Sequence, residues 1–226
     1  MTRTLAIWAA VGALALTGCQ NGRDEAATSD AVSGAETPAG ADTDEAHRFT
    51  VTDFDSIDLV GAVDADVRVG DVASVTALGP DRARLVMRQT GRRILLTQRD
   101  GERVRSGRFV VTVPQLMALT LSGTGDMTVS GLNADHFDIS LSGTGDLDIQ
   151  GSARRARVQL SGTGDLDGDD FRVSDALELD SSGAGDAELN AVNRATVNAS
   201  GAGNVQIKGA QTCTVRNSGT GNVSCG

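Results

Sequence analysis

The chain has 226 residues and a formal net charge of −10, and it contains 28 glycines, three prolines and no tyrosine. The acidic balance excludes nucleic acid as a general partner, because binding to a phosphate backbone needs a basic face. Abundant glycine with little proline is typical of short strands that are joined by tight, recurring turns.

The first 19 residues have the pattern of a bacterial lipoprotein signal peptide. Arg3 precedes an apolar run over residues 5–16, which is shorter than the about 20 residues that a membrane-spanning helix needs. The run ends in Leu16-Thr17-Gly18-Cys19, which resembles the lipobox, in which the cysteine is lipidated and becomes the first residue after cleavage. An ordinary secretory signal with a chance cysteine is the alternative. We therefore predict lipidation at Cys19.

The residues after Cys19 predict where the anchor is placed and how the domain is attached to it. Gln20 follows the cysteine, and by resemblance to proteobacterial sorting this favours the outer membrane. Residues 20–46 contain seven acidic residues and one arginine among small residues, so they bury too little apolar surface to offset the entropy of ordering. We predict a disordered acidic tether that holds the domain off the membrane, in the cell envelope, facing either the periplasm or the cell surface.

Residues 47–226 are predicted to form one repetitive domain, organised by six copies of a five-residue phrase. Each copy reads Ser-Gly-Thr/Ala-Gly-Asp/Asn, and the serines are spaced 20, 19, 21, 18 and 18 residues apart. A fixed phrase at such a period is the signature of a repeat architecture. The six serines are Ser122, Ser142, Ser161, Ser182, Ser200 and Ser218.

Apolar and polar residues alternate on both sides of each phrase, as in strands with one buried face. Each repeat is therefore a strand, a glycine corner, a second strand and an arc, and all variation in length lies in the arc. This pattern predicts an all-β fold, a single-stranded right-handed parallel β-helix (solenoid) with coils of 18–21 residues. The inward columns three residues before and five residues after the serine are Leu119, Ile139, Val158, Leu179, Val197, Val215 and Met127, Leu147, Leu166, Ala187, Val205, Val223.

The residue types of the phrase predict a structural corner. Its two glycines permit positive φ angles and close stacking of the coils, and its serines can form a ladder of hydroxyl groups. The residue in the fifth place can accept hydrogen bonds from turn amides. An alternative use of the acidic members of this column is calcium binding, because stacked like charges repel each other and a cation relieves that repulsion. These members are Asp126, Asp146, Asp165 and Asp186.

Two features lie upstream of the six phrases. The segment from Leu59 to Asp64 looks like a degenerate copy, with Val60 standing 62 residues before Ser122, which predicts about three further coils between them. Residues 81–108 carry nine arginines against three acidic residues. This segment is either a basic patch that faces anionic lipid or lipopolysaccharide, or the solvated face of a strand.

Besides Cys19 the chain has two cysteines, Cys213 and Cys225, which both fall in inward columns of the last coil. We predict a disulfide that ties this coil together in an oxidising compartment. Two buried thiols that act as small apolar side chains are the alternative.

No catalytic set emerges from the sequence, and we predict no cofactor. The two histidines, His47 and His136, have no nucleophile in sequence positions that suggest pairing. A polysaccharide-active enzyme that uses surface carboxylates is the least favoured alternative, because sugar sites favour aromatic platforms and the only tryptophan, Trp8, lies in the signal peptide.

The phrases, together with Val111-Thr-Val-Pro-Gln-Leu116 and Phe54-Asp-Ser-Ile-Asp-Leu59, resemble the bacterial GIN-domain family over residues 50–226. The family is also described as an autotransporter-adhesin head domain, and the resemblance implies a β-helical domain of the cell envelope, often lipoprotein-borne, whose biochemical activity is undefined. We therefore predict a non-catalytic, lipid-anchored envelope protein that binds a protein or an envelope glycan. The variable arcs at 130–136, 150–155 and 169–176 and the arginine-rich segment are the predicted recognition surfaces.

Overall fold

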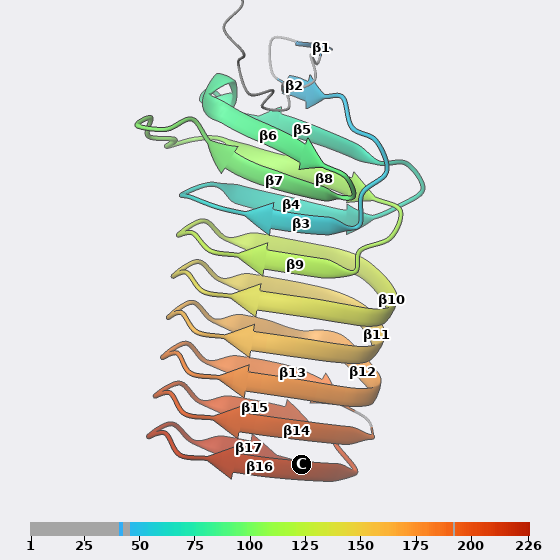
Figure 1. The fold of residues 1–226 in the computed structure, drawn as a ribbon, viewed down its shortest axis with the longest axis vertical. Helices are drawn as coiled ribbons and strands as arrows, with labels where there is room; N and C mark the ends of the chain where they lie inside the picture. The colour runs from blue at the N-terminus through green and yellow to red at the C-terminus, as the bar shows by residue number, and fades with distance from the viewer. Residues whose placement is uncertain (1–40, 43–45, 192) are drawn as a thin grey trace, which may run out of the picture. The chain divides into compact units, whose positions relative to one another are not determined.

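The chain winds into a flattened β-solenoid, in which each coil contributes one strand to a front layer and one to a back layer (Figure 1). The structure is a computed structural model that describes residues 41–42, 46–191 and 193–226. Cys19 and nearly all of the predicted tether lie outside the described residues. In Figure 1 the front strands run to the left and the back strands to the right while the chain descends, so the winding is right-handed, as predicted.

Most of the stack is built from parallel strands. Three long strands bend from the back layer into the front layer: β10 (Met127–Leu141), β11 (Leu147–Leu160) and β12 (Leu166–Ser181). The other front strands are β3 (Ser56–Leu59), β7 (Arg93–Gln98), β9 (Ala118–Leu121), β14 (Arg194–Ala199) and β16 (Thr212–Asn217). The other back strands are β4 (Asp64–Val69), β8 (Arg108–Val113), β13 (Ala187–Ala191), β15 (Val205–Lys208) and β17 (Val223–Cys225).

The core is the narrow space between the two layers, and it is filled by the inward columns predicted from the alternation. Leu119, Val158 and Leu179 of the front layer are at most 1% exposed, as are Leu147 and Val205 of the back layer. The columns stay buried until the last coil, where Val215 is 41% exposed. Since burying a Leu or Val side chain stabilises a fold by about 1.5–3 kcal/mol, these columns provide the main driving force for stacking.

The arcs differ from the prediction of loops on one edge. In β10, β11 and β12 the strand continues through the arc, and the difference in length is absorbed by register shifts such as the one between Val129 and Leu132. Leu132 and Phe171 point inward within these arcs, at 2% and 0% exposure. The arcs stay in the strand because their own apolar residues also have a place in the core.

The upstream segment also differs from the prediction. The degenerate corner stacks directly on the first full one, since the amide of Ser122 donates to the carbonyl of Leu59 at 3.0 Å. β3 pairs with both β7 and β9, and β4 pairs with both β8 and β10. The 61 residues between Val60 and Ser122 are therefore not three further coils. They build the end of the solenoid and return as one coil, β7–β8, on the outer side of β3–β4.

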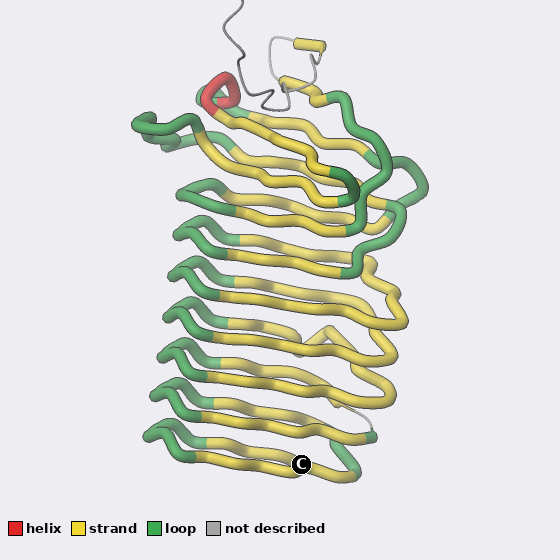
Figure 2. The backbone as a smooth tube through the Cα atoms, in the orientation of Figure 1, coloured by secondary structure: helices red, strands yellow, loops and turns green. Residues whose placement is uncertain are grey.

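That end of the solenoid is a cap of antiparallel strands, shown at the top of Figures 1 and 2. It consists of β2 (Ala46–Phe49), β5 (Ser74–Leu78) and β6 (Leu85–Thr90), with the short β1 (Ala41–Asp42) paired to β2. β2 pairs with β5, β5 with β8, and β6 with β7. A single 3-10 turn, η1 (Arg82–Arg84), connects β5 to β6. In the described part of the chain there is no helix with the length and apolarity needed to cross a membrane.

Candidate functional site

The repeated glycine corner is built from backbone and leaves no room for larger residues. A Cβ atom added at Gly143 would lie 1.9 Å from the carbonyl oxygen of Gly123 in the preceding coil, and one at Gly145 would lie 2.0 Å from that of Gly125. None of these glycines has a positive φ angle, so that part of the prediction is wrong. Glycine is required here because the coils approach each other closely, which was the other part of the prediction.

The serines of the corner do not form a ladder with one another. The Ser182 hydroxyl donates to the carbonyl of Leu160 at 3.4 Å, and the Ser200 hydroxyl donates to the carbonyl of Ser181 at the same distance. The hydroxyls of Ser161 and Ser218 make the same kind of contact, to the carbonyls of Leu141 and Ala199. The serines therefore fasten each coil to the backbone of its neighbour.

The fifth residue of each phrase joins successive coils through its side chain. The Oδ1 atom of Asp126 accepts from the amide of Asp146 at 2.9 Å, that of Asp146 from Asp165 at 2.8 Å, and that of Asp165 from Asp186 at 2.7 Å. Asp64 starts the series and Asn204 continues it to Asn222. This column accepts amide hydrogens, as its residue types predict, and each acceptor serves the coil that follows it.

The same geometry bears on the calcium alternative for this column. In each of the four aspartates, one carboxylate oxygen accepts a hydrogen bond from a backbone amide of the neighbouring coil. Within residues 41–42, 46–191 and 193–226, no group of three or more His, Cys, Asp or Glu side chains is arranged to hold a metal ion. The described geometry gives the column a structural use.

The two cysteines of the last coil are joined. A disulfide links Cys213 of β16 to Cys225 of β17, with 6.4 Å between their Cα atoms, in agreement with the predicted pairing. The bridge connects the front layer to the back layer across the core at the C-terminal end of the stack. It ties together a coil whose side chains are more exposed than those of the coils before it.

The two histidines lie in different parts of the fold. His47 stands on β2, where its ring contacts Phe49 edge to face at 4.5 Å between centroids. His136 lies in the arc of β10, with its Nε2 atom 3.4 Å from a guanidinium nitrogen of Arg155. The described structure does not bring the histidines together.

The outer face of the front layer carries three shallow hollows. The first, about 360 Å³, is lined by residues that include His136, Arg155 and Glu178. The second, about 300 Å³, includes Arg93 and Thr120, and the third, about 460 Å³, spans β12, β14 and β16. They form because short side chains alternate with long, ion-paired ones along the stack. The first and the second share Asp138 and Arg157 in their linings, so these two hollows adjoin each other.

Ion pairs run along this face from coil to coil. Arg157 contacts Glu178 at 3.3 Å and Asp180 at 3.5 Å, and the amide of Asn198 donates to Asp180 at 2.8 Å. Nearer the cap, Arg93 contacts Asp58 at 2.7 Å. Sequence reasoning did not single these residues out. The signal was present in the outward columns, where opposite charges occupy the same place in successive repeats.

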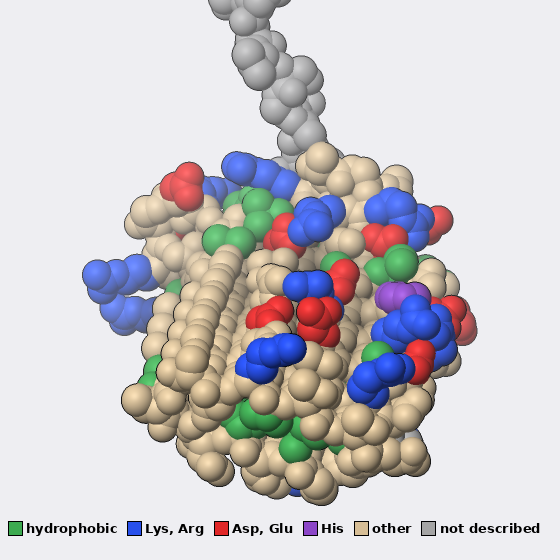
Figure 3. All heavy atoms as spheres, turned by 60° about the horizontal axis from the view of Figure 1, so that its bottom comes forward, with side chains coloured by type: hydrophobic (Ala, Val, Ile, Leu, Met, Phe, Trp, Pro, Cys, Tyr) green, Lys and Arg blue, Asp and Glu red, His purple; other side chains and the backbone are tan. Residues whose placement is uncertain are grey.

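The arcs bring a second group of charges to one long edge of the solenoid, visible beside the front face in Figure 3. We call it the arc-edge cluster: Asp135, His136, Arg154, Arg155, Asp175 and Arg194. Asp175 is its centre, with Arg155 at 3.0 Å, Arg154 at 3.1 Å and Arg194 at 3.9 Å. The cluster draws its residues from four consecutive arcs, and the three arcs predicted as recognition surfaces are among them.

The arginines lower the pKa of the Asp175 carboxyl below its ordinary value. The main cause is the hydrogen bond from Arg155, and the positive charges of Arg154 and Arg194 add to it. Asp175 therefore stays ionised through any physiological pH. The arc-edge cluster is a fixed arrangement of charges that includes more arginines than carboxylates.

Comparisons with known proteins agree with this architecture. A family model described as "Putative auto-transporter adhesin, head GIN domain" matches residues 53–211. Among curated protein sequences, none is significantly similar to this chain.

Solved structures share the fold at low sequence identity. A protein from Bacteroides fragilis described as "a putative adhesin" is 22% identical, with a TM-score of 0.66, and the match covers 79% of this chain and 95% of that one. A "putative adhesin" from Parabacteroides distasonis is 19% identical, with a TM-score of 0.52 and the same coverage. At these identities the likeness shows the fold alone.

Proposed function

The chain belongs to the GIN-domain family of adhesin head domains, and from that premise we propose that it is a lipid-anchored envelope protein that binds a partner through its front face and arc edge. The family places it among adhesin-like proteins of the cell envelope or surface. The proposal adds an anchor, a binding face and a mode of action. The anchor is an acyl group on Cys19, and residues 20–46 serve as a tether.

The observation that carries the proposal is that three hollows lie along the front layer, and that one of them is lined by His136, Arg155 and Arg194 of the arc-edge cluster. Enzymes and carriers of small molecules use concave sites that enclose most of their ligand. A row of shallow hollows along a rigid stack instead fits an extended partner, such as a protein surface or a glycan chain. This arrangement supports binding without catalysis.

The charges on this surface suit a polar partner. Arg157, Glu178 and Asp180 offer both donors and acceptors in one hollow-lined region. Rows of paired charges give specificity and faster association more than they give raw affinity. We therefore expect binding that weakens as salt is raised, because exposed charges are screened.

The test compares two threonines that point outward on opposite layers of the solenoid. Thr120 points outward on the front layer and lines a hollow, whereas Thr128 points outward on the back layer. We expect Thr120→Arg to weaken binding of the full chain to immobilised cell-envelope fragments by about tenfold or more, because a bulky charge fills the hollow. Thr128→Arg introduces the same charge and should leave binding unchanged. Equal losses in both variants would contradict the proposed face.

The anchor is tested separately. Mass spectrometry of the N-terminal peptide from bacterially produced protein should find an acylated Cys19, and Cys19→Ser should release the chain from the membrane fraction. An unmodified cysteine on a chain that is still membrane-bound would contradict the lipid anchor and leave the binding face to its own test.

A further inference from the structure

The cap end of the solenoid carries positive charge while the coils carry negative charge. Residues 79–108 contain nine arginines and three acidic residues, a net charge of +6. Residues 114–226 contain seven basic and 14 acidic residues, a net charge of −7. Residues 46–113 as a whole contain eleven basic and nine acidic residues, a net charge of +2, so the positive charge of this end is concentrated in residues 79–108.

Some of the nine arginines serve the stack itself. Arg92 contacts Asp55 at 2.7 Å, and Arg93 contacts Asp58 at the same distance. Arg108 contacts Asp66 at 3.4 Å. In each pair the acid lies on or beside the neighbouring coil, so these three arginines are already used within the fold.

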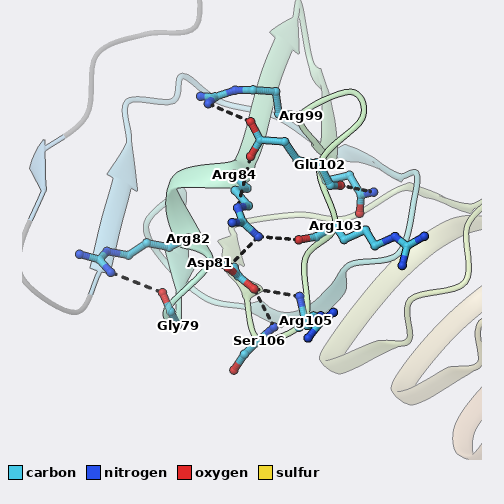
Figure 4. A network of polar contacts seen from close by, with 10 residues as sticks. Gly79, Asp81, Arg82, Arg84, Arg99, Glu102, Arg103, Arg105 and Ser106 are labelled. Carbon is cyan, nitrogen blue, oxygen red and sulfur yellow. Dashed lines mark hydrogen bonds and ion pairs between the residues drawn. The ribbon is translucent and has the colours of Figure 1, made fainter.

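A second group fixes the shape of the loop over residues 99–107, as Figure 4 shows. Arg84 is its hub, with Asp81 at 3.1 Å, Glu102 at 3.3 Å and the carbonyl of Arg103 at 2.7 Å. Asp81 in turn accepts from the amides of Arg105 at 2.9 Å and Ser106 at 3.2 Å. The Arg105 amide is the main reason why the pKa of the Asp81 carboxyl lies below its ordinary value. The loop is thus held in one shape from its base.

Two arginine side chains of this loop take no part in the network and are exposed. Arg103 and Arg105 are exposed, and neither guanidinium makes an ion pair within the described residues. Val104 between them packs against the core. The alternation holds both arginines outward from a loop that is anchored by Val104 and by Asp81.

A hollow of about 370 Å³ lies on the same cap. Phe49 and Leu85, each 4% exposed, contribute its apolar lining, and Arg82 and Arg99 line it as well. An apolar lining with guanidinium groups beside it suits the phosphate and glycerol region of an anionic lipid. Arginine suits phosphate because its planar fork donates two parallel hydrogen bonds.

We propose that the basic cap surface, formed by Arg82, Arg99, Arg103 and Arg105, docks on the anionic phosphate surface of the membrane to which the protein is anchored. This inference rests on the proposed lipid anchor. The cap is the end at which the chain enters the described domain, through β2, and β2 itself contributes His47 and Phe49 to the hollow. The anchored end and the basic end are the same.

Because the segment between Cys19 and the domain is short, a weak contact between the cap and the membrane is enough for docking. Cys19 and Ala41, the first residue of β1, are separated by 21 residues, and a flexible chain of that length has a root-mean-square span of about 25 Å. The cap then meets the membrane at an effective concentration in the millimolar range. Each arginine at an anionic surface strengthens the contact about fivefold, so three or four arginines suffice to dock the tethered domain. Docking at the cap points the coils away from the membrane.

The test uses full-length acylated protein in vesicles of phosphatidylcholine alone or mixed with phosphatidylglycerol. Modification of arginines by phenylglyoxal is followed residue by residue with mass spectrometry. We expect Arg103 and Arg105 to react about tenfold more slowly in the anionic vesicles, and molar salt to abolish this protection because the Debye length shrinks to about 3 Å. Arg172 and Arg216 are exposed on the coils without ion pairs among the described residues, so they serve as internal controls and should react equally in both vesicles.

Two charge-matched variants sharpen the test. Arg103→Ala with Arg105→Ala should remove most of the protection at Arg99, because half of the surface is lost. Arg172→Ala with Arg216→Ala lowers the net charge equally and should leave Arg99 protected. Both pairs alter exposed side chains, so neither is expected to disturb folding.

Several outcomes would overturn the inference. Equal reactivity of Arg103 and Arg105 in both vesicles, on protein that mass spectrometry shows to be acylated and bound, refutes docking and leaves the anchor intact. Salt-sensitive protection in neutral vesicles would also refute it, since this would place the acidic residues 24–45 on the cap. Protein without an acyl group would refute the proposed anchor, and the same labelling after addition of anionic vesicles would still decide whether the cap docks.

Discussion

The two long edges of each coil are built in opposite ways. At the glycine corner the coils touch through backbone, since a Cβ added at Gly143 would lie 1.9 Å from the carbonyl oxygen of Gly123 in the preceding coil, and one phrase occurs six times. At the arc edge the strands shift register, the lengths differ, and Asp175 contacts arginines of the coil before it and the coil after it. The repeated residues of the glycine corner are those that stacking of the coils requires. The arc edge, where length and sequence vary, is the surface available for binding a partner.

The contrast explains why the most conspicuous motif is a poor guide to activity. The hydroxyls of Ser182 and Ser200 and the carboxylates of Asp126 and Asp146 are all engaged with the backbone of an adjacent coil. A site needs groups that can exchange their internal partners for those of a ligand. The exposed ion pairs of the front face and the arc edge are more easily exchanged, because surface pairs contribute only about 0–1 kcal/mol to stability.

The largest expected effect comes from adding one methyl group at the corner. Gly143→Ala places a Cβ against the carbonyl of Gly123, and we expect a loss of about 3 kcal/mol or more in the free energy of unfolding, because neither backbone can move without breaking the stack. Urea denaturation followed by circular dichroism measures it.

The matched control for this change lies one residue further on. Thr144→Ala creates the residue found at the same place in two other phrases, at Ala184 and Ala202. It should cost less than about 0.5 kcal/mol. If the two variants were equally stable, close packing would not be the reason for glycine in the corner.

A smaller effect is expected from the carboxylate ladder. Asp146→Ala removes the acceptor of the Asp165 amide and should cost about 1 kcal/mol, with faster hydrogen exchange at that amide. Asp146→Asn should be nearly neutral, because Asn204 already accepts from the Asn222 amide at 3.1 Å. A large loss in the Asn variant, together with a calcium-dependent rise in melting temperature of the parent, would instead favour the cation alternative.

The smallest effect on folding is expected at the arc edge. The pKa of Asp175 lies below its ordinary value of 3.8, chiefly because Arg155 donates to it. Its contribution to stability is therefore complete above pH 3.8 and is lost as the pH falls through the depressed pKa. Asp175→Asn should leave the melting temperature at neutral pH almost unchanged and should flatten the acid limb of the stability curve. Titration of this carboxyl at its ordinary value in an NMR experiment would contradict the role given to the arginines.

Most of the repetitive part could be predicted from the sequence. The period fixed the corners, the alternation assigned inward columns such as Leu119 and Val158 correctly, and the two cysteines fell where a bridge closes the last coil. These features are local or recur at a constant spacing. In a repeat protein, the constant spacing therefore allows contacts between residues far apart in the chain to be predicted from the sequence.

The cap and the recognition surface could not be predicted in the same way. Ser122 bonds to Leu59 because the chain between them forms the cap and one outer coil before it returns. A constant repeat spacing cannot predict such an insertion. The pairing of Arg157 with Glu178 depends on which outward side chains reach across coils. The use of glycine for contact, with no positive φ angle, depends on a distance between two backbones that only the fold sets.

One measurement tests most directly the claim that the corner is structural and the arc edge recognises. Asp135→Asn with Asp175→Asn changes the arc edge, and Asp146→Asn with Asp165→Asn changes the corner by the same charge. Binding of each full-length variant to immobilised envelope fragments is compared at matched melting temperatures. The account predicts a loss of about tenfold for the arc-edge pair and none for the corner pair. A loss confined to the corner pair would contradict it.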